Sequence, residues 1–227
     1  MQNLVTRTIT GIAYLLIVGI AFFTTKWLLV AIFTALLFIA LYEYIRLSQK
    51  FPVPKNSSQR IIRSQILPFV WIVVPILLIE YWCVILNAVN IMVALFIILC
   101  MNDTMAYLWG SWLGKHKMLP KVSPKKSWEG FFGGLITTMA ACWFLIHIPY
   151  FQNNIFTNQY IWTGFAFVVI MAGTFGDFAE SMVKRFANQK DSGAILPGHG
   201  GILDRIDSML FAVPAGFIYW LVIGGLR

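Results

Sequence analysis

The sequence predicts an all-α fold, that of a polytopic integral membrane protein with about seven transmembrane helices. Of its 227 residues, 59% are hydrophobic and only 11% are charged, and the mean hydropathy is +0.76. The charged residues gather in a few short stretches between long apolar runs. Backbone polar groups in lipid must be hydrogen-bonded within their own segment, so these runs are expected to be helices. The runs fall at about residues 9–25, 27–45, 66–82, 84–101, 131–148, 161–178 and 208–225.

The first four predicted spans form an N-terminal region, residues 1–101, followed by a C-terminal region, residues 102–227. The first span lacks a small-residue cleavage pattern, so it is expected to be a membrane helix and not a cleaved signal peptide. Glu43 and Arg46 are three residues apart near the end of the second span, so they could pair in a structural role. Residues 103–113 either continue the fourth span or add a half-helix.

Lysine and arginine are distributed unevenly between the spans, and this predicts the orientation. The connection after the second span carries five of them and no acid, and the one after the fourth carries five lysines against Glu129. Residues 149–160 carry no charge. The expected topology has a cytoplasmic N-terminus and places Asp103 and the loops 114–130 and 179–207 on the cytoplasmic side of a bacterial-type inner (plasma) membrane. These basic loops account for the net charge of +8 without nucleic acid, either as a topology signal alone or by attracting acidic lipids.

The stretch 177–208 is the most polar part of the chain and holds five of its nine acidic residues. Charge so close to lipid is costly and therefore indicates function. Two groups of three residues each share a helix face by their spacing: Asp177, Ser181 and Lys184, and then Asp204, Asp207 and Ser208. Carboxylates on two facing helix ends, with cations between them, suit a divalent metal that holds phosphate oxygens. The alternative is a solvated interfacial loop whose charges pair with each other.

Two further polar groups lie in the C-terminal half. Asp103 and Tyr107 are four residues apart at the inner edge of the fourth span, so they share a helix face. The plainer interpretation of Asp103 is a helix cap. The loop 121–130 combines Lys125 and Lys126 with hydroxyl groups and a helix N-terminus, which together attract anions. A triphosphate fits such a loop, although its composition is equally consistent with a simple basic loop.

Three motifs resemble those of the phosphatidate cytidylyltransferases, also called CDP-diacylglycerol synthases. The run from Ser181 to Asp207 is similar to the family signature and ends in LPGHGGILDRID. The motif DTMAY, which begins at Asp103, and SPKKSWEG, at 123–130, resemble two other family motifs, with Ser127 where threonine is common. The resemblance implies transfer of the cytidylyl group of CTP to phosphatidate, which gives CDP-diacylglycerol and pyrophosphate.

This resemblance makes 102–227 the catalytic transmembrane region, with an active cavity open to the cytoplasmic side, whereas residues 1–101 match the family only weakly. The residues expected to carry catalysis are Asp177, Lys184, Arg185, Asp204, Arg205 and Asp207. The residues expected to hold Mg²⁺ are Asp177, Asp204 and Asp207, and a second cation such as K⁺ is left open. The residues expected to bind substrate are Asp103, Tyr107, Ser123, Lys125, Lys126, Ser181, Lys190, Asp191, His199, Gly200, Gly201 and Ser208.

The expected partners are CTP, phosphatidate entering sideways from the inner leaflet, membrane lipids and, as an open option, a second copy in a homodimer. His199 is expected to donate a hydrogen bond to phosphate or to organise the glycine turn, because an anionic phosphate nucleophile needs little help from a base. Two other functions stay open. One is another CTP-dependent membrane lipid transferase or kinase. The other is an ion-coupled transporter, which would place charges near the bilayer midplane on broken helices.

Overall fold

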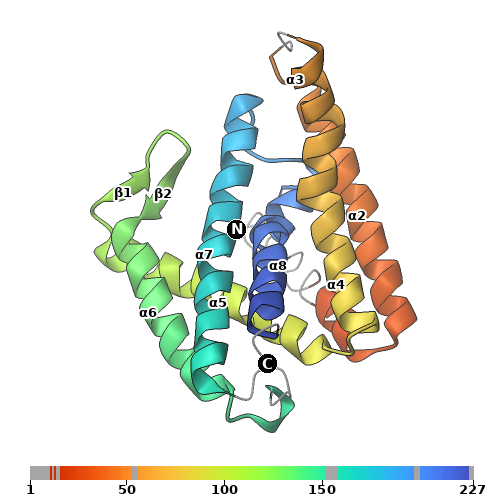
Figure 1. Ribbon diagram of the computed structural model, residues 1–227. Coiled ribbons are helices and arrows are strands. Elements are labelled where there is room, and N and C mark those ends of the chain that lie inside the picture. Colours follow the sequence, from red (N-terminus) through yellow and green to blue (C-terminus); the bar gives the residue numbers. More distant parts are fainter. Residues whose placement is uncertain are drawn as a thin grey trace.

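The computed structural model describes residues 11, 13, 16–52, 56–151, 158–196 and 200–224, and these are mostly helical (Figure 1). The long helices are α2 (Lys26–Ser48), α4 (Val74–Val84), α5 (Val89–Leu113), α6 (Trp128–Leu145), α7 (Gln159–Phe186) and α8 (Leu203–Gly224). Shorter segments are α3 (Ser57–Ile61), two π-helical turns (Ile62–Ile66 and Phe69–Val73) and a 3₁₀ turn (Pro149–Phe151). An antiparallel hairpin of β1 (Lys117–Leu119) and β2 (Ser123–Ser127) joins α5 to α6. The all-α prediction is confirmed, with this small hairpin as an addition.

Four of the described helices are long and apolar enough to cross a membrane: α2, α5, α7 and the segment Leu203–Ile223 of α8. Membrane character is therefore supported, whereas the expected count of about seven spans is not confirmed. The predicted span 9–25 lies partly outside the described residues. The predicted span 66–82 is divided between a π-helical turn and α4, which together give only a shorter apolar helix, Phe69–Val84. Helix α6, with 18 residues, is not among the four.

Helix α5 settles the two alternatives for residues 103–113. It continues without interruption to Leu113, so this stretch is not a separate half-helix. Asp103 lies inside the helix, two residues beyond its midpoint, and the interpretation of this residue as a helix cap is wrong. The residue as a whole is exposed on the helix surface.

Helices α7 and α8 pack along each other in the middle of the molecule (Figure 1). Helix α7 runs to Phe186, beyond Lys184, as the predicted shared face requires. The two helices approach closely at Gly176, where an added Cβ would lie 2.7 Å from the backbone oxygen of Asp207. Small residues allow membrane helices to come this close. Because Asp177 follows Gly176, the contact brings two of the predicted site carboxylates to the same level.

Helices α5 and α6 form a second pair, joined by the hairpin at one end (Figure 1). Here too glycine permits the approach, since a Cβ added to Gly134 would lie 2.9 Å from the backbone nitrogen of Ala106. Ser127 ends β2 and caps α6, because its hydroxyl accepts a hydrogen bond from the Gly130 N–H at 3.2 Å. The hairpin is thus fixed directly to the start of α6.

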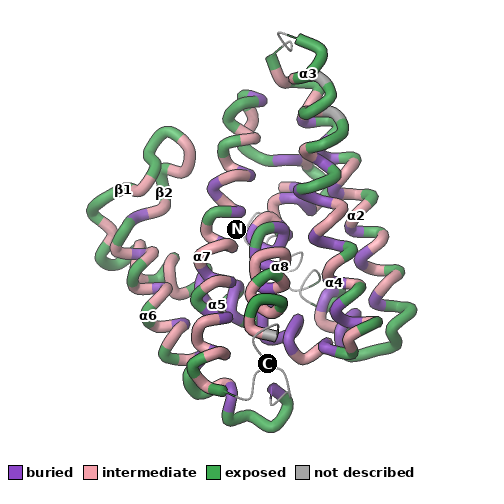
Figure 2. Tube along the Cα trace, viewed as in Figure 1, coloured by how far each residue is buried: buried purple, intermediate pink, exposed green. Residues whose placement is uncertain are grey.

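An apolar core connects the α7–α8 pair to α4, and α4 packs in turn against α2. Trp82 of α4 and Trp162 and Phe165 of α7 are almost completely buried in it. Buried positions follow the inward faces of the helices in Figure 2, while large apolar side chains such as Trp27 and Phe38 are exposed on the outside. An apolar exterior of this kind suits contact with lipid.

The predicted pair between Glu43 and Arg46 is not formed. Arg46 is exposed, and its guanidinium lies beside Tyr42. Glu43 is buried, and its carboxylate accepts hydrogen bonds from the backbone N–H groups of Ile202 and Leu203. The expected structural role therefore has a different partner, the beginning of α8.

Candidate active site

A cavity of about 900 Å³ lies where α5, the hairpin, α6, α7 and α8 meet. Part of its wall is apolar and consists of Phe96, Leu99, Phe131 and Met209. The predicted site residues that line it are Asp103, Tyr107, Lys125, Lys126, Asp177, Lys184, Asp191, Asp204, Arg205, Asp207 and Ser208. Three motifs that are far apart in the sequence therefore contribute to one cavity, which combines charged and apolar surfaces.

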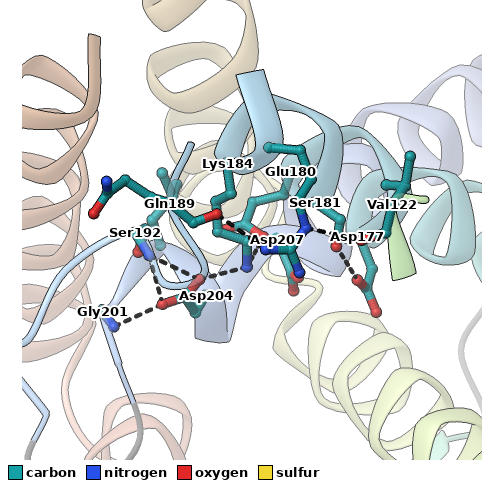
Figure 3. Close-up of polar contacts among 12 residues, drawn as sticks. Val122, Asp177, Glu180, Ser181, Lys184, Gln189, Ser192, Gly201, Asp204 and Asp207 are labelled. Carbon is teal, nitrogen blue, oxygen red and sulfur yellow. Dashed lines mark hydrogen bonds and ion pairs between the residues drawn. The ribbon is translucent and has the colours of Figure 1, made fainter. Parts of the chain in front are cut away.

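Lys184 connects α7 to the start of α8 (Figure 3). Its ammonium group forms an ion pair with Glu180, one turn earlier in α7, and another with Asp204 Oδ1 at 2.6 Å. The side chains of all three residues are largely or completely buried. Buried charges need their partners, because removal of one leaves the others uncompensated in a medium of low dielectric constant. This cluster therefore ties the two helices together at the cavity wall.

Asp204 also holds the loop that runs from α7 to α8 (Figure 3). Its Oδ2 atom accepts hydrogen bonds from the backbone N–H of Ser192 at 3.0 Å and from that of Gly201 at 2.7 Å. Both carboxylate oxygens of Asp204 are thus occupied by contacts within the protein. These contacts fix the position of the first turn of α8 relative to α7.

Asp103, Asp177 and Asp207 form a second acidic group, with one residue each from α5, α7 and α8. All three residues line the cavity. Lys126 Nζ of β2 lies 2.5 Å from Asp177 Oδ2, and the Ser181 hydroxyl donates to Asp177 Oδ1 at 3.4 Å. Among the described residues, only Asp177 of these three forms an ion pair, so the group keeps excess negative charge, which favours binding of a cation.

These contacts indicate which carboxylates suit a divalent cation. Asp204 lines the cavity but is engaged by Lys184 and by two backbone N–H groups, and Asp177 is paired with Lys126. Asp103 and Asp207 also line the cavity, and among the described residues neither forms an ion pair. Within the described ranges, no group of three or more His, Cys, Asp or Glu side chains is arranged to hold a metal ion. Mg²⁺ commonly uses one or two carboxylates together with substrate phosphates and water. The residues present fit that smaller set of protein ligands.

The hairpin presents two lysines at the opposite wall, with Lys125 exposed and Lys126 half-buried. Its base is held by Glu129, whose carboxylate accepts from the backbone N–H groups of Lys115 and His116 at 3.1 Å and lies 2.6 Å from His116 Nδ1. Hydrogen bonds from the backbone N–H of Glu129 itself, then from the His116 ring and the other N–H groups, lower the pKa of this carboxyl from 4.5 to about 2. Glu129 is therefore fully ionised at neutral pH.

Several predicted residues do not line the cavity. These are Ser123, Ser181, Arg185, Lys190, Gly200 and Gly201, and His199 lies outside the described residues. Arg185 donates from Nε to the Val122 carbonyl at 3.2 Å and from Nη1 to the Gln189 carbonyl at 3.1 Å, so it fastens the hairpin to the end of α7. Lys190 instead lines a smaller pocket of about 370 Å³ beside α2, which Asp191 also borders.

Sequence reasoning missed two acidic residues of this region. Glu180 carried a local signal, since it stands four residues before Lys184 and such pairs meet on a helix surface. Glu43 carried none, because its partners Ile202 and Leu203 are 159 and 160 residues away in the chain.

Known proteins are similar to this chain over long stretches. A family model described as the cytidylyltransferase family matches residues 53–223. A phosphatidate cytidylyltransferase from Haemophilus influenzae is 40% identical over 164 residues, which cover 70% of this chain and 56% of the relative. One from Staphylococcus aureus is 44% identical over 119 residues, which cover 52% of this chain and 44% of the relative. The chain thus spans about half the length of the curated relatives it matches. Its extensive match to the family model shows that the chain belongs to the cytidylyltransferase family.

Proposed function

We propose that this protein transfers the cytidylyl group of CTP to phosphatidate, giving CDP-diacylglycerol and pyrophosphate. The observation that carries the proposal is the single cavity in which carboxylates, lysines and an apolar wall meet. The negative charge of a nucleoside triphosphate is bound by basic side chains such as lysine. Carboxylates can hold the divalent cation that assists phosphoryl transfer, and an apolar wall can bind the chains of a lipid substrate. The relatives named phosphatidate cytidylyltransferase support the choice of this reaction among those that use such a cavity.

The triphosphate would lie against the hairpin. Lys125 and Lys126 line the cavity there, next to the N-terminus of α6, where the helix dipole favours an anion. Lys184 and Arg205 line the other side and would reach the phosphates from α7 and α8. Ser208 and Tyr107 offer hydroxyl groups on the same lining, and His199 would donate from the glycine turn.

Asp177 and Asp207 would hold Mg²⁺, with Asp103 beside them. Asp177 would exchange Lys126 for the cation, and Asp204 would join only if it also exchanged its present partners. The same acidic group could accommodate a second cation such as K⁺. When bound, the divalent cation would neutralise charge on the phosphate oxygens. The chain's own residues would position the two substrates and exclude water.

The lipid would enter between membrane helices from the inner leaflet, with its phosphate beside the acidic group and its chains against Phe96, Leu99 and Met209. A phosphatidate oxygen would then attack the α-phosphorus of CTP in line. As that bond forms, the bond from the α-phosphorus to the bridging oxygen breaks, and pyrophosphate leaves with the electron pair. Catalysis would consist mainly of positioning and neutralisation of spreading charge.

The proposed orientation places the cavity and the N-terminus on the cytoplasmic side of a bacterial inner membrane, where CTP is available. Residues 102–227 would form the catalytic region, with the loops 114–130 and 179–207 facing the cytoplasm. The basic connections between helices support this orientation. Helices before residue 102 would support that region, and a homodimer is compatible with this arrangement.

Purified protein in detergent, incubated with phosphatidate, Mg²⁺ and CTP labelled at the α-phosphate, tests the reaction. We expect label in CDP-diacylglycerol and release of unlabelled pyrophosphate. CTP labelled at the γ-phosphate should give labelled pyrophosphate and no labelled lipid. A lipid labelled from the γ-phosphate would instead indicate a CTP-dependent kinase, and no labelled lipid from either nucleotide would contradict the proposal.

A further inference from the structure

Glu43 is a buried carboxylate in α2 with an unusual set of partners. Only 2% of its surface is exposed. Its Oε1 atom accepts from the Ile202 N–H at 3.1 Å, and its Oε2 atom accepts from the Leu203 N–H at 2.8 Å and from the Ser192 hydroxyl at 3.3 Å. Among the described residues it forms no ion pair with a basic side chain. Hydrogen-bond donors around α8 therefore satisfy its charge.

These donors include the orphan N–H groups that every helix start leaves without an intrahelical partner. Helix α8 begins at Leu203, so Glu43 caps it from a different helix. A negative charge there is also favoured by the dipole of α8. A carboxylate suits the position because two acceptor oxygens can serve two N–H groups at once.

The loop before α8 closes tightly around this carboxylate. A Cβ at Gly193 would lie 2.8 Å from Glu43 Cδ, and a Cβ at Gly201 would lie 2.7 Å from the same atom. Only glycine therefore allows the chain to pass Glu43 on both sides. The contact fixes the loop at two points as well as the first turn of the helix.

Glu43 and Asp204 contact the same loop. Ser192 donates its hydroxyl to Glu43 and its backbone N–H to Asp204. Gly201 donates to Asp204 and packs against Glu43. Because Asp204 is in turn paired with Lys184, Glu43 is connected through one layer of contacts to the charged wall of the cavity.

We infer that Glu43 is a positioning residue, which sets the first turn of α8 so that Asp204 and Asp207 face the cavity. Glu43 lies before residue 53, where the family match begins, so the inference assigns a part in the site to a helix outside that match. The effect on turnover rests on the proposed function, whereas the effect on the loop does not.

The test compares Glu43→Gln with Glu80→Gln. Glu80 is a matched control, since it is a partly buried carboxylate of α4 that accepts from the Thr34 hydroxyl at 3.0 Å and does not line the cavity. The amide of Glu43→Gln keeps one acceptor and turns its NH₂ group toward an N–H donor. We expect amides of residues 192–203 to exchange hydrogen about 10-fold faster than in the wild type, by loss of one capping contact, and Glu80→Gln to leave them unchanged.

Turnover in the labelled-CTP assay gives the second readout. Glu43→Gln should lower kcat about 10-fold or more, while KM for CTP changes less than about 3-fold because the hairpin lysines are untouched. If Glu43→Gln does not fold, Ser192→Ala removes one of its contacts and keeps the backbone donor to Asp204, and should show the same changes more weakly.

The outcomes separate two failures. If the wild type makes no CDP-diacylglycerol but Glu43→Gln still speeds exchange in the loop, the proposed function is wrong and the positioning stands for another reaction. If exchange over 192–203 is unchanged in Glu43→Gln, or if Glu80→Gln changes it equally, Glu43 does not position α8. The inference would also be overturned if Glu43→Gln and Glu80→Gln raised KM for CTP and lowered kcat to the same extent.

Discussion

The two charged walls of the cavity are built in different ways. At the α7–α8 wall, Lys184 is paired with Glu180 and Asp204, and Asp204 also accepts from two backbone N–H groups. At the hairpin wall, Lys126 is paired with Asp177, whereas Lys125 is exposed and among the described residues forms no ion pair. The α7–α8 wall is thus held in place before any substrate arrives, whereas the hairpin wall keeps the ammonium group of Lys125 available.

This difference suits the two tasks of a nucleotidyltransferase. Preorganised charges contribute most where charge develops during the reaction, because they need no rearrangement at that moment. A flexible, solvated lysine contributes more to capture of a charged ligand. The comparison therefore predicts that substitutions at the α7–α8 wall lower turnover or stability, whereas those at the hairpin raise KM.

Asp207→Asn gives the largest expected effect. It removes one of the carboxylates proposed to hold Mg²⁺ while keeping the shape of the side chain. We expect turnover with CTP and phosphatidate to fall about 10²- to 10³-fold, with unchanged unfolding in detergent. Asp177→Asn should behave in the same way. Near-normal rates in both variants would show that these carboxylates do not act in the reaction.

Lys184→Met tests how firmly the fixed wall is held. The variant leaves Glu180 and Asp204 buried without their cation, so the free energy of unfolding should fall by about 3–5 kcal/mol. The measurement is denaturant unfolding in detergent. The double variant Glu180→Gln with Lys184→Met should recover part of the loss, since one buried charge is then absent. A loss of the same size in the single and double variants would argue against this pairing.

Lys125→Ala should affect capture more than chemistry. It removes one positive charge from the hairpin wall, so KM for CTP should rise about 10-fold while kcat stays within about 2-fold. Lys121→Ala is the matched control, because Lys121 is an exposed lysine of the same hairpin that does not line the cavity. The rise should shrink at high salt. Equal effects of the two substitutions would show that the hairpin acts only through its overall charge.

The two walls also differ in how much of them could be predicted from sequence. The shared faces of Asp177 with Lys184 and of Asp204 with Asp207 follow from helix periodicity, which is a local property, and both helices reach the lengths that this requires. The hairpin was expected only as a basic loop, because its strands are short and polar. Its antiparallel pairing, which sets Lys117 opposite Ser127 and Leu119 opposite Ser123, is not indicated by the composition of the loop.

Long-range contacts explain the remaining differences. Apolar runs correctly predicted helices, but the count of about seven spans is not confirmed. Hydropathy does not distinguish a long helix from one interrupted by π-helical turns, as around Phe69–Val73. The predicted partner of Glu43 was wrong. Arg46 is close to Glu43 in the sequence, whereas the N-terminus of α8 is close to it only in the folded protein.

Glu129→Gln is expected to have the smallest effect. It tests how firmly the hairpin wall is attached to the start of α6. The neutral amide offers one acceptor where the carboxylate offers two oxygens to Lys115, His116 and the His116 ring. We expect a rise of about 2- to 3-fold in KM for CTP, with kcat unchanged.

The sign of the pH dependence at Glu129 follows from its lowered pKa. A pKa depressed from 4.5 to about 2 in the folded protein means that the contribution of Glu129 is present above about pH 4.5 and is lost as the pH falls toward 2. The wild-type hairpin should therefore show constant protection from proteolysis between about pH 5 and 8. Glu129→Gln should be cleaved faster over that whole range. If its cleavage matches the wild type, strand pairing and the Ser127 cap hold the hairpin without Glu129.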